Sequence, residues 1–201
     1  MTRPVVIGLA GGIGSGKSFV ARILQEAGCV VYDADREVAA LYKRSDVLET
    51  LRSWWGDAVT QGGELDRAEV ARIIFEDERQ RERLEGYLFP LLHQRRQDMI
   101  AEAGRRGAKA FVIDAPLLFE ANLDPECDRV VFVDTPRAMR LERLRARSGW
   151  DETELARREK AQLPLEVKRE RSDDCLDGSA GADALRARVL ELLDEILADQ
   201  D

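Results

Sequence analysis

The stretch Gly11-Gly12-Ile13-Gly14-Ser15-Gly16-Lys17-Ser18 decides how the rest of the chain is interpreted. It matches the phosphate-binding loop pattern Gly-x-x-x-x-Gly-Lys-Ser/Thr. The apolar run before it, residues 4–10, is typical of a buried strand, and residues 18–27 after it have the pattern of an amphipathic helix that Gly28 ends. Strand, loop and helix in this order favour a bound phosphate over a plain glycine turn, because loop N–H groups and a helix N-terminus both attract anions.

Two side chains of this segment have separate expected tasks. Lys17 supplies a point charge for the β- and γ-phosphates, and the Ser18 hydroxyl supplies a ligand for Mg²⁺. The pattern therefore predicts binding of ATP or GTP together with Mg²⁺. The residues of this segment expected to contact ATP are Gly12, Ile13, Gly14, Ser15, Gly16, Lys17, Ser18 and Phe19.

Composition narrows the class of protein. The 201 residues carry a formal net charge of −8, so we expect no binding to nucleic acid or to anionic membranes. No apolar run approaches the length of a membrane span, and no N-terminal signal pattern is present. The three cysteines are far apart, so we interpret them as buried apolar residues in a reducing compartment, the cytoplasm. A monomer or small homo-oligomer is expected.

Four further apolar runs predict the remaining strands of a sheet. Each run ends in an aspartate: 29–32 in Asp33, 110–113 in Asp114, 129–133 in Asp134 and 174–176 in Asp177. Continuous β-branched runs separated by helical patterns indicate a five-stranded parallel sheet flanked by helices, an α/β fold. Because ligands of such sheets bind at the carboxyl ends of the strands, several carboxylates should lie near the phosphate loop.

Residues 36–108 interrupt this alternation. The stretch predicts helices at 36–53, 67–76 and about 79–105, with turn signals at Gly56, Gly62-Gly63 and Pro90. A single crossover helix needs far less chain. We therefore expect an all-helical insertion that holds a second substrate; the alternative is an insertion that only enlarges the core.

Residues 137–171 form a basic region in this acidic chain. Arg140, Arg143 and Arg147 fall on one helical face, with Leu141 and Leu144 on the core side. The break at 148–150 then resembles a hinge. These features predict an arginine-bearing flap over a polyphosphate, with Arg143 and Arg147 contacting phosphate. The alternative is a solvated face held by pairs such as Glu154–Arg158.

The strand-end aspartates suggest the chemistry. Asp33, beside the loop strand, is the best candidate to deprotonate an acceptor hydroxyl, while Asp35 competes for that role but better suits a helix cap. Asp114 or Asp134 would serve Mg²⁺. We prefer Asp114, because Pro116 and the apolar residues after it suggest a rigid substrate wall. Together these features predict a small-molecule kinase.

The chain resembles the dephospho-coenzyme A kinases over nearly its whole length. The matching segments are Leu9–Ser18, Asp33-Ala34-Asp35, Gly63–Arg67, Leu84-Glu85 with Pro90, Asp114–Glu120, Arg143-Leu144 with Arg147-Ser148-Gly149, and Ala161–Pro164 with Lys168. The resemblance implies transfer of the ATP γ-phosphate to the 3′-hydroxyl of dephospho-coenzyme A. It also implies a P-loop fold like that of nucleoside monophosphate kinases, with a helical substrate domain and a lid.

The resemblance assigns boundaries and roles. A nucleotide-binding core would comprise 1–35, 109–138 and 172–201, an acceptor domain 36–108 and a lid 139–171. The residues implied as catalytic are Lys17, Asp33 and Arg143; Arg143 and Arg147 join the ATP contacts; Asp33, Pro90, Asp114, Pro116 and Leu117 would bind the acceptor; and Ser18 and Asp114 would bind Mg²⁺.

Four positions differ from the family's usual residues: Phe19, Phe89, Arg140 and Gly178, where Thr, His, Gln and Asn respectively are common. Phe89 affects an expected acceptor contact, and Gly178 affects an expected contact to adenine. Two alternatives remain: a nucleoside or nucleotide kinase of the same fold, and a nucleotide-binding regulator without kinase activity.

Overall fold

The computed structural model describes residues 3–199. Residues 1–2 and 200–201, the outer ends of the predicted nucleotide-binding core, lie outside the described residues. The chain divides into two compact units. One, the sheet unit, comprises the chain up to Ala34 and from Ile100 onward; the other, the helical unit, is Asp35–Met99. Residues 139–171, for which we predict a lid, belong to the sheet unit in this division.

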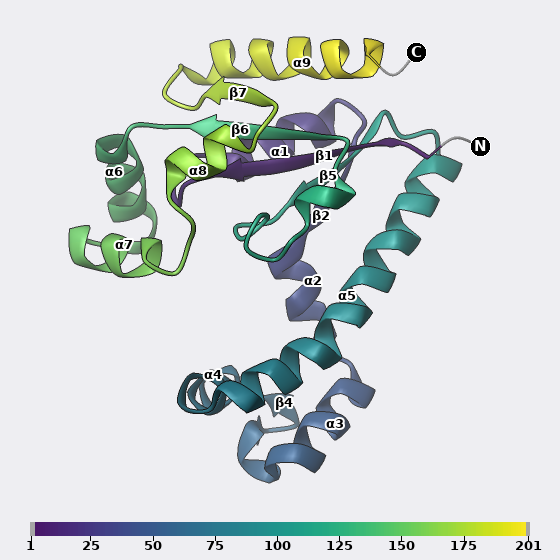
Figure 1. The fold of residues 1–201 in the computed structure, drawn as a ribbon, viewed down its shortest axis with the longest axis vertical. Coiled ribbons are helices and arrows are strands. Elements are labelled where there is room, and N and C mark those ends of the chain that lie inside the picture. Colours follow the sequence, from purple (N-terminus) through teal and green to yellow (C-terminus); the bar gives the residue numbers. More distant parts are fainter. Residues whose placement is uncertain (1–2, 200–201) are drawn as a thin grey trace. The chain divides into compact units, whose positions relative to one another are not determined.

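The sheet unit is built on five parallel strands (Figure 1). In spatial order they are β2 (Val30–Asp33), β5 (Ala110–Asp114), β1 (Val5–Gly11), β6 (Arg129–Asp134) and β7 (Asp174–Asp177). All five coincide with the runs that end in aspartate or lead into the glycine loop, so the prediction of a five-stranded parallel sheet is confirmed.

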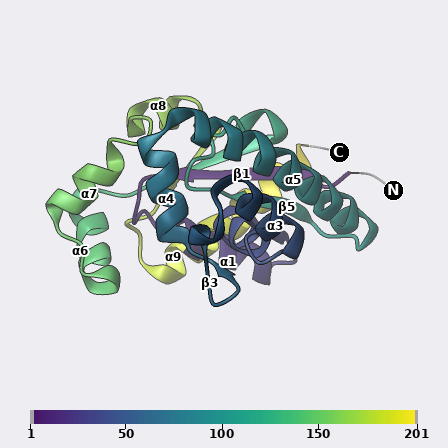
Figure 2. The ribbon, with the colours of Figure 1, turned by 90° about the horizontal axis from the view of Figure 1, so that it is seen from below.

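Helices cover both faces of the sheet, which explains the unbroken apolar runs. Helices α1 (Lys17–Glu26) and α9 (Ala182–Ala198) pack against each other on one face, and α8 (Leu165–Glu170) lies on the opposite side of β1 (Figure 2). Residues such as Ile7, Val112 and Val131 are therefore buried among helical side chains. Central strands of a parallel sheet need apolar residues at consecutive positions for this reason.

One cysteine departs from the expectation. Cys29 is buried and Cys127 is partly buried, but Cys175 is exposed, so the prediction that all three are buried is wrong. Cys175 lies on the edge strand β7, where successive side chains alternate between faces, and it is its neighbour Leu176 that points into the core.

The helical unit is less regular than predicted. The expected helix 36–53 is two helices, α2 (Ala34–Leu41) and α3 (Ser45–Trp55). The chain turns at 42–44 because Arg44 adopts an extended conformation (ψ 135°) before α3, with its side chain on Asp46. The insertion is also not all-helical: β3 (Thr60–Gln61) and β4 (Glu64–Leu65) form a hairpin at whose turn Gly62 and Gly63 both have positive φ.

The two remaining helices complete the unit and its core. They are α4 (Arg67–Glu76) and α5 (Glu78–Arg105), the latter continuing into the sheet unit. Asp66 caps α4 by accepting from two backbone N–H groups. Pro90, which the sequence predicts to mark a turn, lies inside α5. Gly86 stands four residues before it, where proline meets the preceding turn and a residue without Cβ adapts most easily.

The other helices are α6 (Arg137–Ser148) and α7 (Glu152–Glu159), with short 3₁₀ turns at Asp57–Val59 and Asp124–Glu126. Among the helices of the described residues, none combines the length and apolarity needed to cross a bilayer.

Burial of the central strands predicts a large penalty for truncation there. Phe111 on β5 is 0% exposed and Phe75 on α4 is 93% exposed. Phe111→Ala should lower the free energy of unfolding by about 3–5 kcal/mol, since it removes buried surface and leaves a cavity. Urea denaturation followed by circular dichroism measures this change. The matched variant Phe75→Ala should shift it by less than about 0.5 kcal/mol; equal effects would contradict the described core.

Candidate functional site

The glycine loop lies where β1 passes into α1. Lys17 folds back over the loop, its Nζ donating to the Gly11 carbonyl at 3.2 Å. Gly14 has φ +79°, and a Cβ there would lie 2.9 Å from the Arg140 carbonyl oxygen, so the loop excludes any larger residue. No side chain caps the start of α1, whose N-cap is Gly16. Main-chain N–H groups at this terminus are therefore suited to an anion.

Two carboxylates are brought together by the register of the sheet. Asp33 is the backbone partner of Asp114, and Asp114 is the backbone partner of Leu9 on the loop strand. Asp33 is exposed and Asp114 half-buried. The sheet therefore places these two predicted residues side by side at the carboxyl edge. The prediction that Asp33 ends the strand beside the loop strand is wrong, because β5 lies between β2 and β1, and it is Asp114 that pairs with the loop strand, two residues before the glycine loop begins.

Asp134 has a different environment. It ends β6, on the other side of β1 from β5. Its carboxylate accepts a hydrogen bond from Arg169 Nη1 at 3.1 Å, and its backbone partner is Asp177 on the edge strand. Asp134 is thus separated from the Asp33–Asp114 pair by the loop strand and is engaged by a cation.

Two arginines of α6 donate hydrogen bonds to main-chain carbonyls of the glycine loop. Arg143 donates from Nη1 to the Ser15 carbonyl (3.1 Å) and from Nη2 to the Gly178 carbonyl (2.8 Å). Arg140 is only 2% exposed; it donates to the carbonyls of Ile13 and Thr135 and pairs with Glu159 at 2.7 Å. Arg140 therefore departs from the expected phosphate-facing row, because its guanidinium is enclosed and satisfied by protein oxygens.

The end of α6 is more exposed. Arg147 is exposed, and Gly149, with φ +67°, ends the helix as the hinge-like break predicted. Beyond it, the expected pair Glu154–Arg158 is confirmed at 2.6 Å. Leu144, Leu155 and Trp150 form a small apolar cluster that also includes Ile13 of the glycine loop. The region 139–159 is thus packed directly on the loop.

Gly178 is explained by its neighbour Thr135. A Cβ at Gly178 would lie 2.1 Å from Thr135 Oγ1 and 2.8 Å from the Ser15 carbonyl oxygen. Thr135 Oγ1 donates to that same carbonyl at 2.9 Å. The close approach of these two segments to the loop leaves no room for a side chain at position 178.

A buried ion pair joins two segments that are far apart in the sequence. Lys168 is 1% exposed and its Nζ lies 2.8 Å from Glu120 Oε1, with a further bond to Gln162 Oε1 at 3.1 Å. Glu120 also accepts from the Leu163 N–H at 2.7 Å. Burial raises the pKa of Glu120, but the bonds from Lys168 and Leu163 outweigh burial and leave this pKa below its ordinary value. The pair anchors α8 and the segment before it to the loop after β5.

The remaining predicted residues lie in both units. Pro116 and Leu117 follow β5, with Leu117 43% exposed while Leu118 and Phe119 are buried. Pro90 belongs to the helical unit and is exposed, as is Phe89. Leu117 is thus open to solvent close after Asp114.

The donor set at the loop fits Mg²⁺ carried by a nucleotide. Ser18 in the first turn of α1 offers a hydroxyl, and Asp114 and Asp33 offer carboxylates. Mg²⁺ prefers oxygen ligands and is usually held by one or two carboxylates together with waters and substrate phosphates. Within residues 3–199 no group of three or more His, Cys, Asp or Glu side chains could hold a metal by itself.

Some residues around the loop were not identified from the sequence: Arg140 as a loop support, Thr135, and the Glu120–Lys168 pair. One signal was available for Arg140, since it stands four residues before the core residue Leu144 and so lies close to it on the helix surface. For the other residues, only the long-range contact reveals the role.

The family model of dephospho-CoA kinase matches residues 5–184. That match spans most of the chain. The chain belongs to the dephospho-CoA kinase family. A dephospho-CoA kinase of Nitrobacter winogradskyi is 39% identical over 189 residues, covering 94% of both chains, and one of Deinococcus radiodurans is 40% identical over 188 residues, covering 94% of this chain and 90% of its own.

A solved structure agrees with the fold. The crystal structure of a Thermus thermophilus protein aligns over 100% of both chains with a TM-score of 0.83 and 34% identity. Two of the sequence segments that resemble the dephospho-CoA kinase family contact each other in the structure. Glu120 of one segment meets Gln162 and Lys168 of another in a single buried cluster.

The Glu120–Lys168 pair predicts a pH-dependent contribution to stability. A carboxyl whose pKa is lowered by folding stabilises the protein above its unfolded pKa, about 4.3, and loses this contribution as the pH falls through the folded value. Glu120→Gln should cost about 3 kcal/mol at pH 7, because Lys168 is left buried without its counter-charge. The difference from wild type in chemical denaturation should shrink below about pH 4. Glu166→Gln, at an exposed neighbouring carboxylate, is the control. A stability difference between Glu120→Gln and wild type that did not change with pH would contradict the Glu120–Lys168 ion pair.

The contact between Gly178 and Thr135 predicts non-additive substitutions. Gly178→Ala should destabilise by about 1–3 kcal/mol through overpacking. Combining it with Thr135→Ala, which removes the nearest of the clashing oxygens, should recover about 1 kcal/mol relative to the sum of the single variants. Thermal unfolding of the four proteins measures the coupling. Gly181→Ala, whose Cβ would meet open space, should instead be additive with Thr135→Ala.

Proposed function

We propose that this chain transfers the γ-phosphate of ATP to the 3′-hydroxyl of dephospho-coenzyme A, giving coenzyme A and ADP. Family membership supports the substrates. The observation that carries the mechanism is the sheet register, which sets Asp33 beside Asp114, and Asp114 beside the strand leading into the glycine loop.

ATP would bind along the loop. The N–H groups of Gly12–Phe19 and the start of α1 would receive its β- and γ-phosphates, with Lys17 as the neutralising charge. Arg143 is held against the loop by two carbonyls, so its guanidinium is oriented before nucleotide arrives. We assign Arg143 to the transferring phosphate and Arg147, at the exposed end of the same helix, to ATP.

Asp33 would act as the general base. Its carboxylate takes the proton of the 3′-hydroxyl as the oxygen forms its bond to the γ-phosphorus, and the bond from that phosphorus to the β–γ bridging oxygen breaks to release ADP. Asp114 and Ser18 would hold Mg²⁺, which when bound neutralises charge on the phosphates. The register that places Asp114 beside Asp33 supports Asp114 over Asp134 for this task.

The two units would divide the substrates. We assign the acceptor to residues 36–108 and a lid to 139–171, with Pro90, Pro116 and Leu117 as further acceptor contacts. Leu117 supports this through its exposure close after Asp114. The free cysteines agree with a reducing compartment, and we place the protein in the cytoplasm.

The test measures ADP formation with ATP and Mg²⁺, with and without dephospho-coenzyme A, and with adenosine or AMP as control acceptors. Stimulation by dephospho-coenzyme A, with a product one phosphate heavier, is expected. Stimulation by adenosine or AMP instead would indicate a nucleoside or nucleotide kinase. Slow ATP hydrolysis that no acceptor stimulates would indicate a regulator.

Asp33→Asn separates binding from chemistry. It should lower kcat by about 10²-fold or more while nucleotide affinity survives, because only proton removal is lost. Asp35→Asn, two residues away, is the matched comparison and should cost less than about tenfold. Steady-state kinetics with nucleotide titration measures both. The reverse order of effects would move the base to Asp35.

A further inference from the structure

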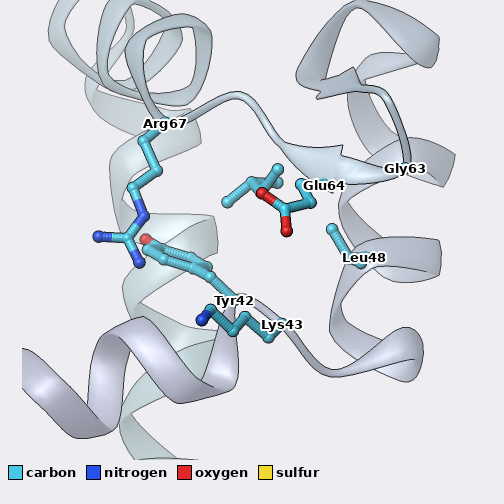
Figure 3. A pocket seen from close by; sticks show the side chains of 7 residues that line it. Tyr42, Lys43, Leu48, Gly63, Glu64 and Arg67 are labelled. Atoms are coloured by element: carbon cyan, nitrogen blue, oxygen red, sulfur yellow. The ribbon is translucent and has the colours of Figure 1, made fainter.

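The helical unit contains a hollow that none of the assigned residues uses. Its volume is about 280 Å³, and it lies between the end of α2, the β3–β4 hairpin and the start of α4 (Figure 3). The lining residues are Tyr42, Lys43, Leu48, Gly63, Glu64, Leu65 and Arg67. All belong to the helical unit, so the hollow is formed within one compact body.

Local structure explains why these side chains converge. The turn between α2 and α3 directs Tyr42 and Lys43 to one wall, and the first residue of α4 supplies Arg67 above the Tyr42 ring, 5.6 Å from its centre. Glu64 of β4 faces them from the hairpin side (Figure 3). The positive φ values at the hairpin turn make its tight reversal possible.

The two cations that line the hollow, Lys43 and Arg67, differ from the nearby arginines in their carboxylate partners. Arg44 pairs with Asp46 at 2.5 Å, Arg52 pairs with Asp57, and Arg72 pairs with Glu69 and Glu76. For Lys43 and Arg67, by contrast, the described residues offer no carboxylate within 4.0 Å, although the chain as a whole is acidic. With two cations and the single carboxylate of Glu64, the lining of the hollow carries a net positive charge, which suits an anionic ligand.

The rest of the lining suits a ligand that is not anionic throughout. Leu48 and Leu65 are half-buried and give the hollow an apolar wall. Burial raises the pKa of Tyr42, more than nearby Arg67 lowers it, so the phenol remains a hydrogen-bond donor at neutral pH. Glu64 can accept from amide N–H or hydroxyl groups. The ligand should therefore join a phosphate to a chain with both alkyl groups and hydrogen-bond donors.

We infer that this hollow binds the phosphopantetheine end of dephospho-coenzyme A, with Lys43 and Arg67 on the phosphate, Leu48 and Leu65 on the alkyl carbons, and Glu64 on an amide or hydroxyl. This inference rests on the proposed function, since it concerns the part of the acceptor that does not react. The volume of the hollow, about 280 Å³, lies near the lower limit of ligand pockets, about 300 Å³. It therefore fits a portion of the substrate and not the whole molecule.

The experiment measures KM for dephospho-coenzyme A, KM for ATP and kcat in Lys43→Ala, Arg67→Ala and the double variant. Each single variant should raise KM for dephospho-coenzyme A roughly tenfold, the effect of losing one charge-assisted contact. KM for ATP and kcat should stay within about twofold of wild type. Arg44→Ala and Arg72→Ala, neighbouring arginines already neutralised by carboxylates, are the matched controls and should leave KM unchanged.

A competitor removes the reacting part of the substrate. 4′-Phosphopantetheine carries the phosphate and the pantetheine chain but no ribose to phosphorylate. It should inhibit wild type competitively against dephospho-coenzyme A, and its inhibition should weaken roughly tenfold in Lys43→Ala. Arg67→Lys, which keeps the charge, should recover much of the affinity lost in Arg67→Ala.

The outcomes separate the two proposals. If wild type does not phosphorylate dephospho-coenzyme A, the proposed function fails. If wild type phosphorylates dephospho-coenzyme A and the double variant keeps KM for dephospho-coenzyme A within about twofold of wild type, the proposed function stands and the hollow does not bind this substrate. A parallel rise in both KM values would also overturn the inference, because it would report a general change in the protein. Lys43 is exposed, so its variant tests the idea even if Arg67→Ala folds poorly.

Discussion

Everything at the site depends on the position of β1, which is hydrogen-bonded on both sides, to β5 and to β6. A parallel strand in the middle of a sheet cannot shift its register by one residue without moving its buried side chains to the wrong face. Val6 and Leu9 are fully buried, so the end of β1 and the loop that follows are fixed with respect to the neighbouring strand ends. Backbone pairing places Asp114 beside Leu9 of the loop strand and Asp33 beside Asp114.

The parts of the fold that follow local rules could be predicted from the sequence. Unbroken apolar runs identified all five strands, and parallel pairing implied that their terminal carboxylates share an edge. The glycine loop was recognisable because strand, turn and helix N-terminus all occur within one short segment. Local sequence patterns were therefore sufficient to predict the strands of the sheet and the edge at which their terminal aspartates lie.

The features that were missed depend on contacts between distant residues. Nothing in the pattern around Glu120 indicates that Lys168 lies beneath it, and a lysine in a charged segment is normally exposed. Arg140 similarly belongs to a basic helix face, yet it is enclosed because the loop carbonyls and Glu159 satisfy it. The short hairpin at 60–65 was missed because two-residue strands have no periodicity to detect. The break at 42–44 was missed because no glycine or proline marks it.

Ile13 links the glycine loop to the region beyond it. Its side chain packs with Leu144 of α6, Leu155 of α7 and Trp150 between them, so the same residue contributes to the loop and to the core of the following helices. An anion that restrains the loop also restrains this small core, and the free energy of local opening of α7 then includes part of the binding energy. Backbone amides of α7 would consequently exchange their hydrogens more slowly in the presence of nucleotide, making this helix a natural reporter of occupancy at the loop.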